Sequence, residues 1–123
     1  MTKTILVVDD SGTVRQQVSM ALKQAGFAIV EAADGEEALA AIDSNRAIDM
    51  VVCDVNMPNL NGLEMVEKIK SNPDHKALPI LMLTTEGQPS MIKRAKEAGA
   101  VGWIVKPFDA NQLVQTAKHL TKS

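Results

Sequence analysis

Apolar residues along this 123-residue chain follow two alternating patterns. Five short runs are apolar at consecutive or nearly consecutive positions: Ile5–Val8, Ala28–Val30, Met50–Cys53, Ile80–Leu83 and Val101–Val105. Such runs are typical of strands that are covered on both faces, as in a parallel sheet. The second run is the shortest and is followed by Glu31, so we expect it at an edge of the sheet.

Between these runs, apolar residues recur at the spacing of an amphipathic helix. Five segments show it: Val14–Ala25, Ala38–Ile42, Leu63–Ile69, Ile92–Ala98 and Leu113–Leu120. Gly26, Gly99 and the pair Asn72-Pro73 are typical signals for a helix end, and Asp109 is a typical N-cap. The order predicts an α/β fold, a doubly wound five-stranded parallel sheet of the (βα)₅ type, in one domain over residues 1–123.

Charge and cysteine content exclude several classes of protein. The net charge of -2 gives no reason to expect the phosphate attraction of a nucleic-acid binder. The single cysteine, Cys53, cannot form an internal disulfide and is expected to be a buried thiol in a reducing compartment. The N-terminus lacks a signal-peptide pattern, and no apolar run is long enough for membrane insertion. We therefore expect a cytoplasmic protein.

Polar residues follow four of the five predicted strands. These are Asp9 and Asp10, then Asp54, then Thr84 and finally Lys106. Each is weak evidence alone, because an Asp before Ser-Gly can be only a helix cap and a lone Lys is usually a surface residue. The carboxyl ends of parallel strands share one rim, where ligands of doubly wound sheets bind. We therefore expect these side chains to converge.

Three crowded carboxylates repel one another and need a compensating cation. A site of oxygen ligands with room for water suits Mg²⁺, and the open positions of Mg²⁺ usually take phosphate oxygens. Lys106 adds a positive charge and Thr84 a hydroxyl donor, and an Asp can itself be the nucleophile that forms an acyl phosphate. The residues predict a phosphoryl-transfer site without a P-loop.

Four segments in combination resemble a known family: LVVDDS, VVCDVNMPNLNG, LMLTTEG and WIVKPF. Together they make the chain, from Ile5 to Leu120, similar to response-regulator receiver domains, most like stand-alone chemotaxis proteins of the CheY type. The resemblance implies a flavodoxin-like fold with strand order 2-1-3-4-5. That order comes with the resemblance and not from the apolar pattern.

The resemblance also implies roles for the acidic residues. Asp54 is the expected phosphoacceptor, which takes a phosphoryl group from a histidine kinase. Asp9, Asp10, Asp54 and the backbone carbonyl of Asn56 are the expected Mg²⁺ ligands. Asn56 and Glu86 stand where the family tunes the lifetime of the phosphoryl group.

Further roles fall on the last two strands. Lys106 is expected to pair with the carboxylate or acyl phosphate, and Thr84 to bind a phosphoryl oxygen. The family's aromatic switch position is Trp103, where Tyr or Phe is usual, and Thr85 stands where Ala is frequent. The alternative for Trp103 is an ordinary, partly buried core aromatic. A cis peptide bond is expected before Pro107.

The resemblance implies a phosphorylation-gated binding switch rather than an enzyme with a separate substrate, although the chain would catalyse its own phosphorylation and dephosphorylation. The expected partners are a chemotaxis-type histidine kinase, a flagellar motor switch protein or other protein target, and a phosphatase. We expect a monomer before phosphorylation, with an output surface around Met91, Trp103 and Lys106.

The sequence leaves two alternatives open and disfavours two others. The first two are a phosphate sink or phosphorelay receiver and the excised N-terminal receiver of a longer regulator. A phosphatase of the haloacid-dehalogenase type is disfavoured because Asn56 replaces its second Asp. A flavodoxin-like electron carrier is disfavoured because the chain has few aromatics and no Ser/Thr-rich phosphate loop.

Overall fold

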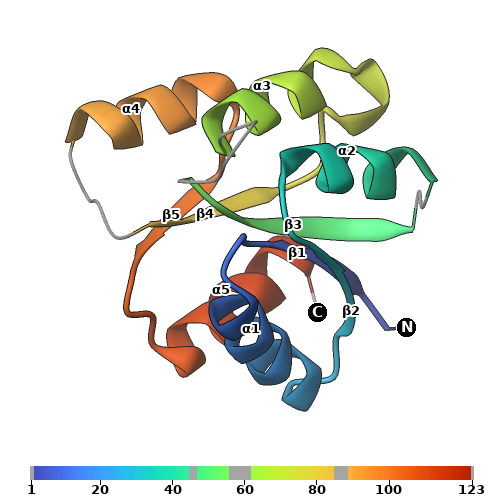
Figure 1. Cartoon of the computed structure of the whole chain (residues 1–123), viewed down its shortest axis with the longest axis vertical. Coiled ribbons are helices and arrows are strands. Elements are labelled where there is room, and N and C mark those ends of the chain that lie inside the picture. Colours follow the sequence, from blue (N-terminus) through green and yellow to red (C-terminus); the bar gives the residue numbers. More distant parts are fainter. Residues whose placement is uncertain (1, 45–46, 56–61, 85–88, 123) are drawn as a thin grey trace.

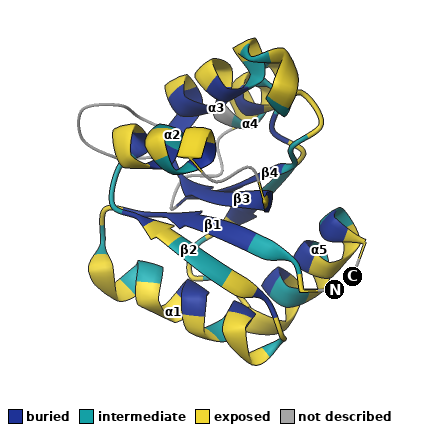
Figure 2. Cartoon of the chain, turned by 90° about the vertical axis from the view of Figure 1, so that its right-hand side faces the viewer, coloured by how far each residue is buried: buried dark blue, intermediate teal, exposed yellow. Residues whose placement is uncertain are grey.

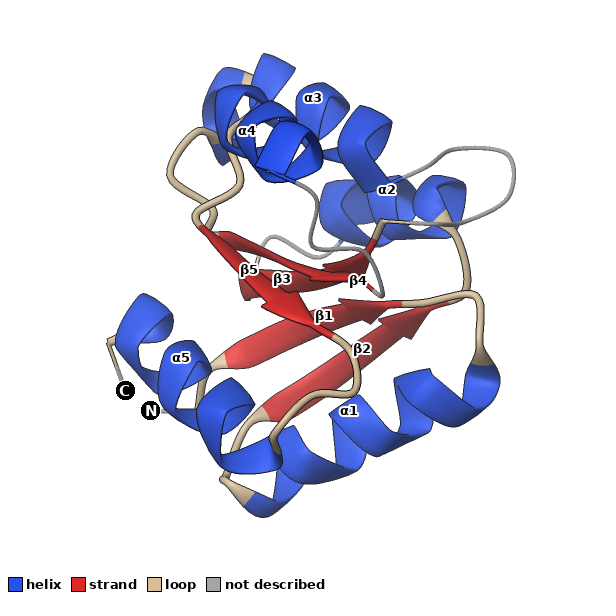
Figure 3. Ribbon diagram, turned by 90° about the vertical axis from the view of Figure 1, so that its left-hand side faces the viewer, coloured by secondary structure: helices blue, strands red, loops and turns tan. Residues whose placement is uncertain are grey.

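The computed structural model describes residues 2–44, 47–55, 62–84 and 89–122. Five strands form one parallel sheet in the order β2-β1-β3-β4-β5 (Figure 3). They are β1 (Thr4–Val8), β2 (Ala28–Ala32), β3 (Ile48–Asp54), β4 (Ile80–Thr84) and β5 (Gly102–Val105). The parallel sheet, its strand order and the edge position of β2 confirm the predicted fold.

Helices cover both faces of this sheet. The five α-helices are α1 (Gly12–Gln24), α2 (Gly35–Ser44), α3 (Gly62–Ser71), α4 (Pro89–Ala98) and α5 (Ala110–Thr121). In Figure 1, α2, α3 and α4 lie on one side of the sheet and α1 and α5 on the other. The central strands β1, β3 and β4 are therefore buried on both faces, which explains why their apolar residues are consecutive rather than alternating.

The two faces of the sheet carry separate hydrophobic clusters. Figure 2 shows buried positions along the strands and on helices of both sides of the sheet. Leu6, Val51 and Met82 pack on the side of α2, α3 and α4. Their sequence neighbours Val7, Val52, Leu81 and Leu83 belong to the cluster with α1 and α5. Because neighbouring residues of a strand point to opposite faces, each apolar run supplies both clusters at once.

Some boundaries differ from the predicted ones. Strand β2 continues through Glu31 to Ala32, and β3 begins at Ile48 rather than Met50. A carboxylate oxygen of Asp49 accepts a hydrogen bond from the backbone N–H of Thr4 at 2.9 Å, which ties the start of β3 to β1. A short 3₁₀-helix, η1 (Pro73–His75), follows α3 and was not predicted.

Local signals explain where several helices begin and end. The side chain of Asp109 accepts hydrogen bonds from the first turn of α5, as predicted for an N-cap. Gly99 follows α4 with a φ of 117°, a conformation that favours glycine.

Among the described residues, none of the helices combines the length and apolarity that a bilayer-spanning segment requires.

The start of α3 lies against the end of β3 at Gly62. Its backbone N–H donates to the carbonyl of Val55 at 2.9 Å. A Cβ atom added at Gly62 would overlap the carbonyl oxygen of Asp54 and lie 2.9 Å from the Cα atom of Val55. Both obstacles are backbone atoms, so they cannot move aside without distorting the strand that ends in Asp54.

We predict that Gly62→Ala lowers the free energy of unfolding by about 2 kcal/mol, because the methyl group is forced into backbone. Gly12→Ala is the matched control, since its added Cβ would meet only the Arg15 side chain at 3.8 Å. Urea unfolding should leave this control within about 1 kcal/mol of the wild type. Equal effects of the two substitutions would contradict the steric account.

Candidate functional site

Strand register brings the polar strand ends to one level of the sheet. Val8 at the end of β1 pairs with Cys53 of β3, so Asp9 and Asp54 each follow a member of that pair. Thr84 at the end of β4 pairs with Val105 of β5, which immediately precedes Lys106. Because β1, β3, β4 and β5 are successive neighbours in the sheet, these side chains meet at its carboxyl rim.

Three carboxylates come together at this rim. Each of Asp9, Asp10 and Asp54 offers one oxygen, and these three oxygens lie within 4.8 Å of one another. Asp9 is only 2% exposed and Asp54 only 6%, whereas Asp10 is exposed. Two carboxylates are thus nearly withdrawn from water, where their charges interact more strongly than at an exposed site.

Lys106 places a cation between the two buried carboxylates. Its Nζ atom lies 3.0 Å from Oδ2 of Asp9 and 3.3 Å from Oδ1 of Asp54. Its backbone N–H donates to the carbonyl of Thr84 at 2.6 Å, which fixes the chain just after β5. Burial lowers the pKa of Lys106, but the hydrogen bond to Asp9 and the charge of Asp54 outweigh burial and raise the pKa above its ordinary value. The ammonium therefore stays charged at neutral pH.

Ser11, and not Asp10, caps α1. The Ser11 hydroxyl oxygen accepts a hydrogen bond from the backbone N–H of Val14 at 3.3 Å. The Ser11 backbone N–H in turn donates to Oδ1 of Asp9 at 2.9 Å. The possibility that the Asp before Ser-Gly serves only as a helix cap is therefore wrong, and both carboxylates point to the rim.

Thr84 and Trp103 are the predicted site residues on the last two strands. Thr84 is fully buried at the end of β4. Trp103 on β5 is partly buried and packs against the cluster beneath α2, α3 and α4. Its indole Nε1 is buried and has no hydrogen-bond partner within the part of the chain that the structure describes. Trp103 therefore occupies the position expected of a core aromatic, and its part in switching is a matter for proposal.

Cys53 lies directly before Asp54 and is completely buried, as predicted. Burial, followed by the charges of Asp54 and Asp9, raises the pKa of the thiol well above its usual range, although Lys106 acts in the opposite direction. The thiol is therefore neutral at physiological pH. It packs 3.8 Å from the sulfur of Met65 as a small apolar group.

Several expected residues lie outside the described part of the chain. They are Asn56, Thr85 and Glu86, together with the side chain of Met91. The peptide bond between Lys106 and Pro107 is cis, as the family resemblance implied.

Two features near the site were not predicted from the sequence. Arg15 donates a hydrogen bond from Nη1 to the backbone carbonyl of Asp9 at 2.7 Å.

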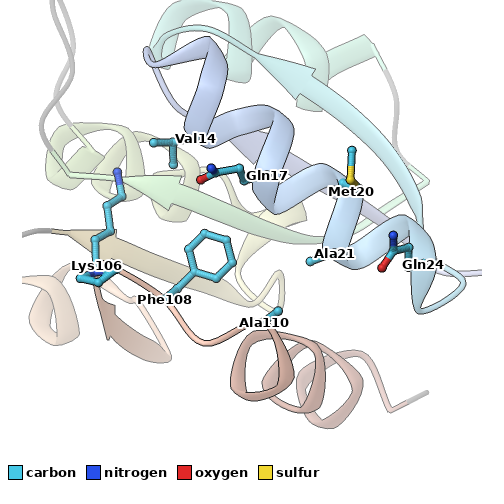
Figure 4. A pocket seen from close by; sticks show the side chains of 9 residues that line it. Val14, Gln17, Met20, Ala21, Gln24, Lys106, Phe108 and Ala110 are labelled. Atoms are coloured by element: carbon cyan, nitrogen blue, oxygen red, sulfur yellow. The ribbon is translucent and has the colours of Figure 1, made fainter.

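A cavity of about 620 Å³ lies between α1 and residues 106–110 (Figure 4). Phe108 and the stem of Lys106 line it from one side and residues of α1, among them Val14 and Met20, from the other. The helical spacing of α1 placed Val14 in the core but gave no signal for a cavity.

The donor set fits a hard divalent cation. All three acidic side chains offer oxygen, the ligand type that Mg²⁺ prefers, and the exposure of Asp10 leaves one side open to water. His75 lies in η1 and His119 in the last turn of α5, so neither belongs to this carboxylate cluster. The residues Asp9, Asp10 and Asp54 would hold the ion.

Comparison with known proteins identifies the family of the chain. Residues 5–118 match the response regulator receiver domain family. The chain is 41% identical to the chemotaxis protein CheY1 of Helicobacter pylori over 105 residues, which cover 85% of each protein. It is 39% identical to a chemotaxis protein CheY homolog of Campylobacter jejuni over 85% of this chain and 81% of that protein.

Solved structures show the same likeness. The chemotaxis protein CheY4 of Vibrio cholerae superimposes with a TM-score of 0.92 at 42% identity, over 98% of this chain and 99% of that one. A putative response regulator of Chloroflexus aurantiacus gives a TM-score of 0.94 at 37% identity, over the whole of both chains. The chain therefore belongs to the response regulator receiver domain family, in its CheY-type branch.

Proposed function

We propose that this protein is a phosphorylation-gated switch in which Asp54 accepts a phosphoryl group from a histidine kinase. The observation that carries the proposal is a nearly buried Asp54 carboxylate beside two further carboxylates and the Lys106 ammonium. Membership in the receiver family and the names of the chemotaxis relatives support the same role. The protein acts as a signal carrier and not as an enzyme with a separate substrate.

In the proposed reaction, a carboxylate oxygen of Asp54 attacks the phosphorus atom of the phosphodonor. The new O–P bond forms as the P–N bond to the donor histidine breaks, and the imidazole keeps the electron pair and takes a proton from solvent. A bound Mg²⁺ supplies charge neutralisation for the phosphoryl oxygens. Lys106 offsets part of the added negative charge, and Thr84 lies at the adjacent strand end to donate to a phosphoryl oxygen.

The chain's own geometry suggests how phosphorylation changes the surface. Lys106 is bound to Asp9 and Asp54 before phosphorylation, and new phosphoryl oxygens compete for the same ammonium. The backbone N–H of Lys106 donates to the carbonyl of Thr84, so a displacement of either residue moves the ends of both β4 and β5. Trp103, three residues before Lys106 on β5, is our proposed aromatic switch residue. The partner is a protein target such as a flagellar motor switch protein.

Acetyl phosphate with Mg²⁺ should give one phosphoryl adduct on the wild-type protein, measured by intact-mass spectrometry. Asp54→Ala should abolish it because the nucleophile is gone. Asp43→Ala, which removes an exposed carboxylate on α2, is the matched control and should be modified as the wild type is. Absence of a wild-type adduct, or an undiminished adduct in Asp54→Ala, would overturn the assignment.

Lys106→Met should lower the free energy of unfolding in Mg²⁺-free buffer by about 2 kcal/mol, because two nearly buried carboxylates lose their cation. Millimolar Mg²⁺ should restore more stability to this variant than to the wild type. Lys70→Met is the control, since Lys70 donates only to the backbone carbonyls of Lys76 and Leu78 among its described contacts. Its loss of about 1 kcal/mol should not depend on Mg²⁺. An equal Mg²⁺ effect in both variants would contradict the competition described here.

Beryllofluoride with Mg²⁺ should increase capture of a flagellar motor switch protein by the immobilised wild-type chain. Asp54→Ala should show the same low capture with and without beryllofluoride, because the acceptor carboxylate is missing. A wild-type protein that forms the phosphoryl adduct but binds no target in either state would instead indicate a phosphate sink.

A further inference from the structure

Arg15, in the first turn of α1, reaches back over the turn that carries the two consecutive aspartates. Its Nη1 donates to the backbone carbonyl of Asp9 at 2.7 Å, and its Nε donates to Oε1 of Glu31 at 3.1 Å. Its backbone N–H donates to the carbonyl of Ser11, the N-cap residue, at 2.9 Å. One residue thus joins α1, the end of β2 and the loop after β1.

The other polar atoms of Asp9 are also occupied. The backbone N–H donates to the carbonyl of Ala32 at 3.2 Å, Oδ1 accepts from the N–H of Ser11 and Oδ2 accepts from Lys106. An incoming cation can compete for the carboxylate oxygens, but it does not replace the hydrogen bond at the carbonyl. The contact from Arg15 therefore uses none of the carboxylate oxygens that would bind a metal ion.

The carbonyl that Arg15 binds belongs to the peptide unit between Asp9 and Asp10. Because that unit is planar, a hydrogen bond to its oxygen fixes the direction in which the chain enters Asp10. Asp10 is exposed, so it lacks the packing that holds Asp9 and Asp54 in place. Orientation of its carboxylate toward the other two depends on the backbone of this turn.

Glu31 restrains the other side of the guanidinium. The Arg15 side chain is 23% exposed and that of Glu31 is 42% exposed, so the ion pair alone is a weak surface interaction. Its effect is to hold the planar guanidinium so that one edge meets Glu31 while a terminal nitrogen meets the Asp9 carbonyl. An arginine is suited to this because its donors form a rigid fork.

We propose that Arg15 is a positioning residue for divalent-cation binding, which holds the Asp9–Asp10 peptide in the orientation that brings both carboxylates to Asp54. The inference rests on the proposed function, in that Mg²⁺ is the ion concerned. Arg15 acts through the backbone of the ligand residues and occupies no carboxylate oxygen of Asp9, so it does not compete with the ion. Lys106, by contrast, occupies the carboxylate oxygens themselves.

Isothermal titration of the metal-free protein with Mg²⁺ tests this. Arg15→Met should weaken Mg²⁺ binding about tenfold, as for other groups that orient metal ligands. Glu31→Gln should weaken it about threefold because only the restraint on the guanidinium is lost. The double variant should match Arg15→Met, since both residues act through one hydrogen bond. Glu31→Gln also keeps the test valid if Arg15→Met fails to fold.

Lys23→Met is the matched control, because it removes one exposed positive charge from the last turn of the same helix. It should leave the Mg²⁺ dissociation constant within twofold of the wild type, because salt screens the interaction between exposed charges that are separated by more than about 10 Å. The inference is overturned if Arg15→Met binds Mg²⁺ as the wild type does, or if Lys23→Met weakens binding equally.

Phosphorylation of the wild-type protein by acetyl phosphate separates this inference from the proposed function. A wild-type adduct together with unchanged Mg²⁺ affinity in Arg15→Met overturns only the role of Arg15. Weakened Mg²⁺ affinity in Arg15→Met without any wild-type adduct supports the role of Arg15 and overturns phosphorylation at Asp54. A wild-type protein that binds no Mg²⁺ overturns the inference.

Discussion

The repulsion among three carboxylates at the carboxyl rim is the constraint on which the site depends. Asp9 and Asp54 are nearly buried, so water screens their charges little, and the folded chain offsets them with the ammonium of Lys106. That ammonium contacts two carboxylates at once. A cation would compete with it for the carboxylate oxygens, and a phosphoryl group would compete with the carboxylates for the ammonium. A cation held by the three carboxylates would therefore take over part of the charge neutralisation that Lys106 supplies.

The packed sheet holds the carboxylates close together despite their repulsion. The central strands are packed on both faces, so the strand ends cannot move apart without opening one of the two hydrophobic clusters. Gly62 adds a second restraint, because α3 begins in backbone contact with the end of β3. Asp9 is fixed by hydrogen bonds at its N–H, carbonyl and carboxylate atoms. This rigid support therefore holds Asp9 and Asp54 close together.

The strands, the helices and the rim residues could be predicted because their signals are local: consecutive apolar runs, helical spacing, and acids directly after a strand. The start of β3 at Ile48 could not, because it follows from the hydrogen bond between Asp49 and Thr4 across two strands. The capping role of Ser11 and the contact of Arg15 with Asp9 depend on side-chain conformations that no spacing encodes. The roles of Asn56 and Glu86 stay predictions, since both residues lie outside the described ranges.

The ion pair between Asp9 and Lys106 joins residues 97 positions apart. The carboxylates of β1 and β3 are in the chain long before the ammonium that follows β5, and their charge is balanced only when the last strand has joined the sheet. A chain that has not yet added β5 therefore presents an acidic rim without its internal counter-ion. The pairing of Asp9 and Asp54 with Lys106 thus needs the whole sheet, from β1 to β5.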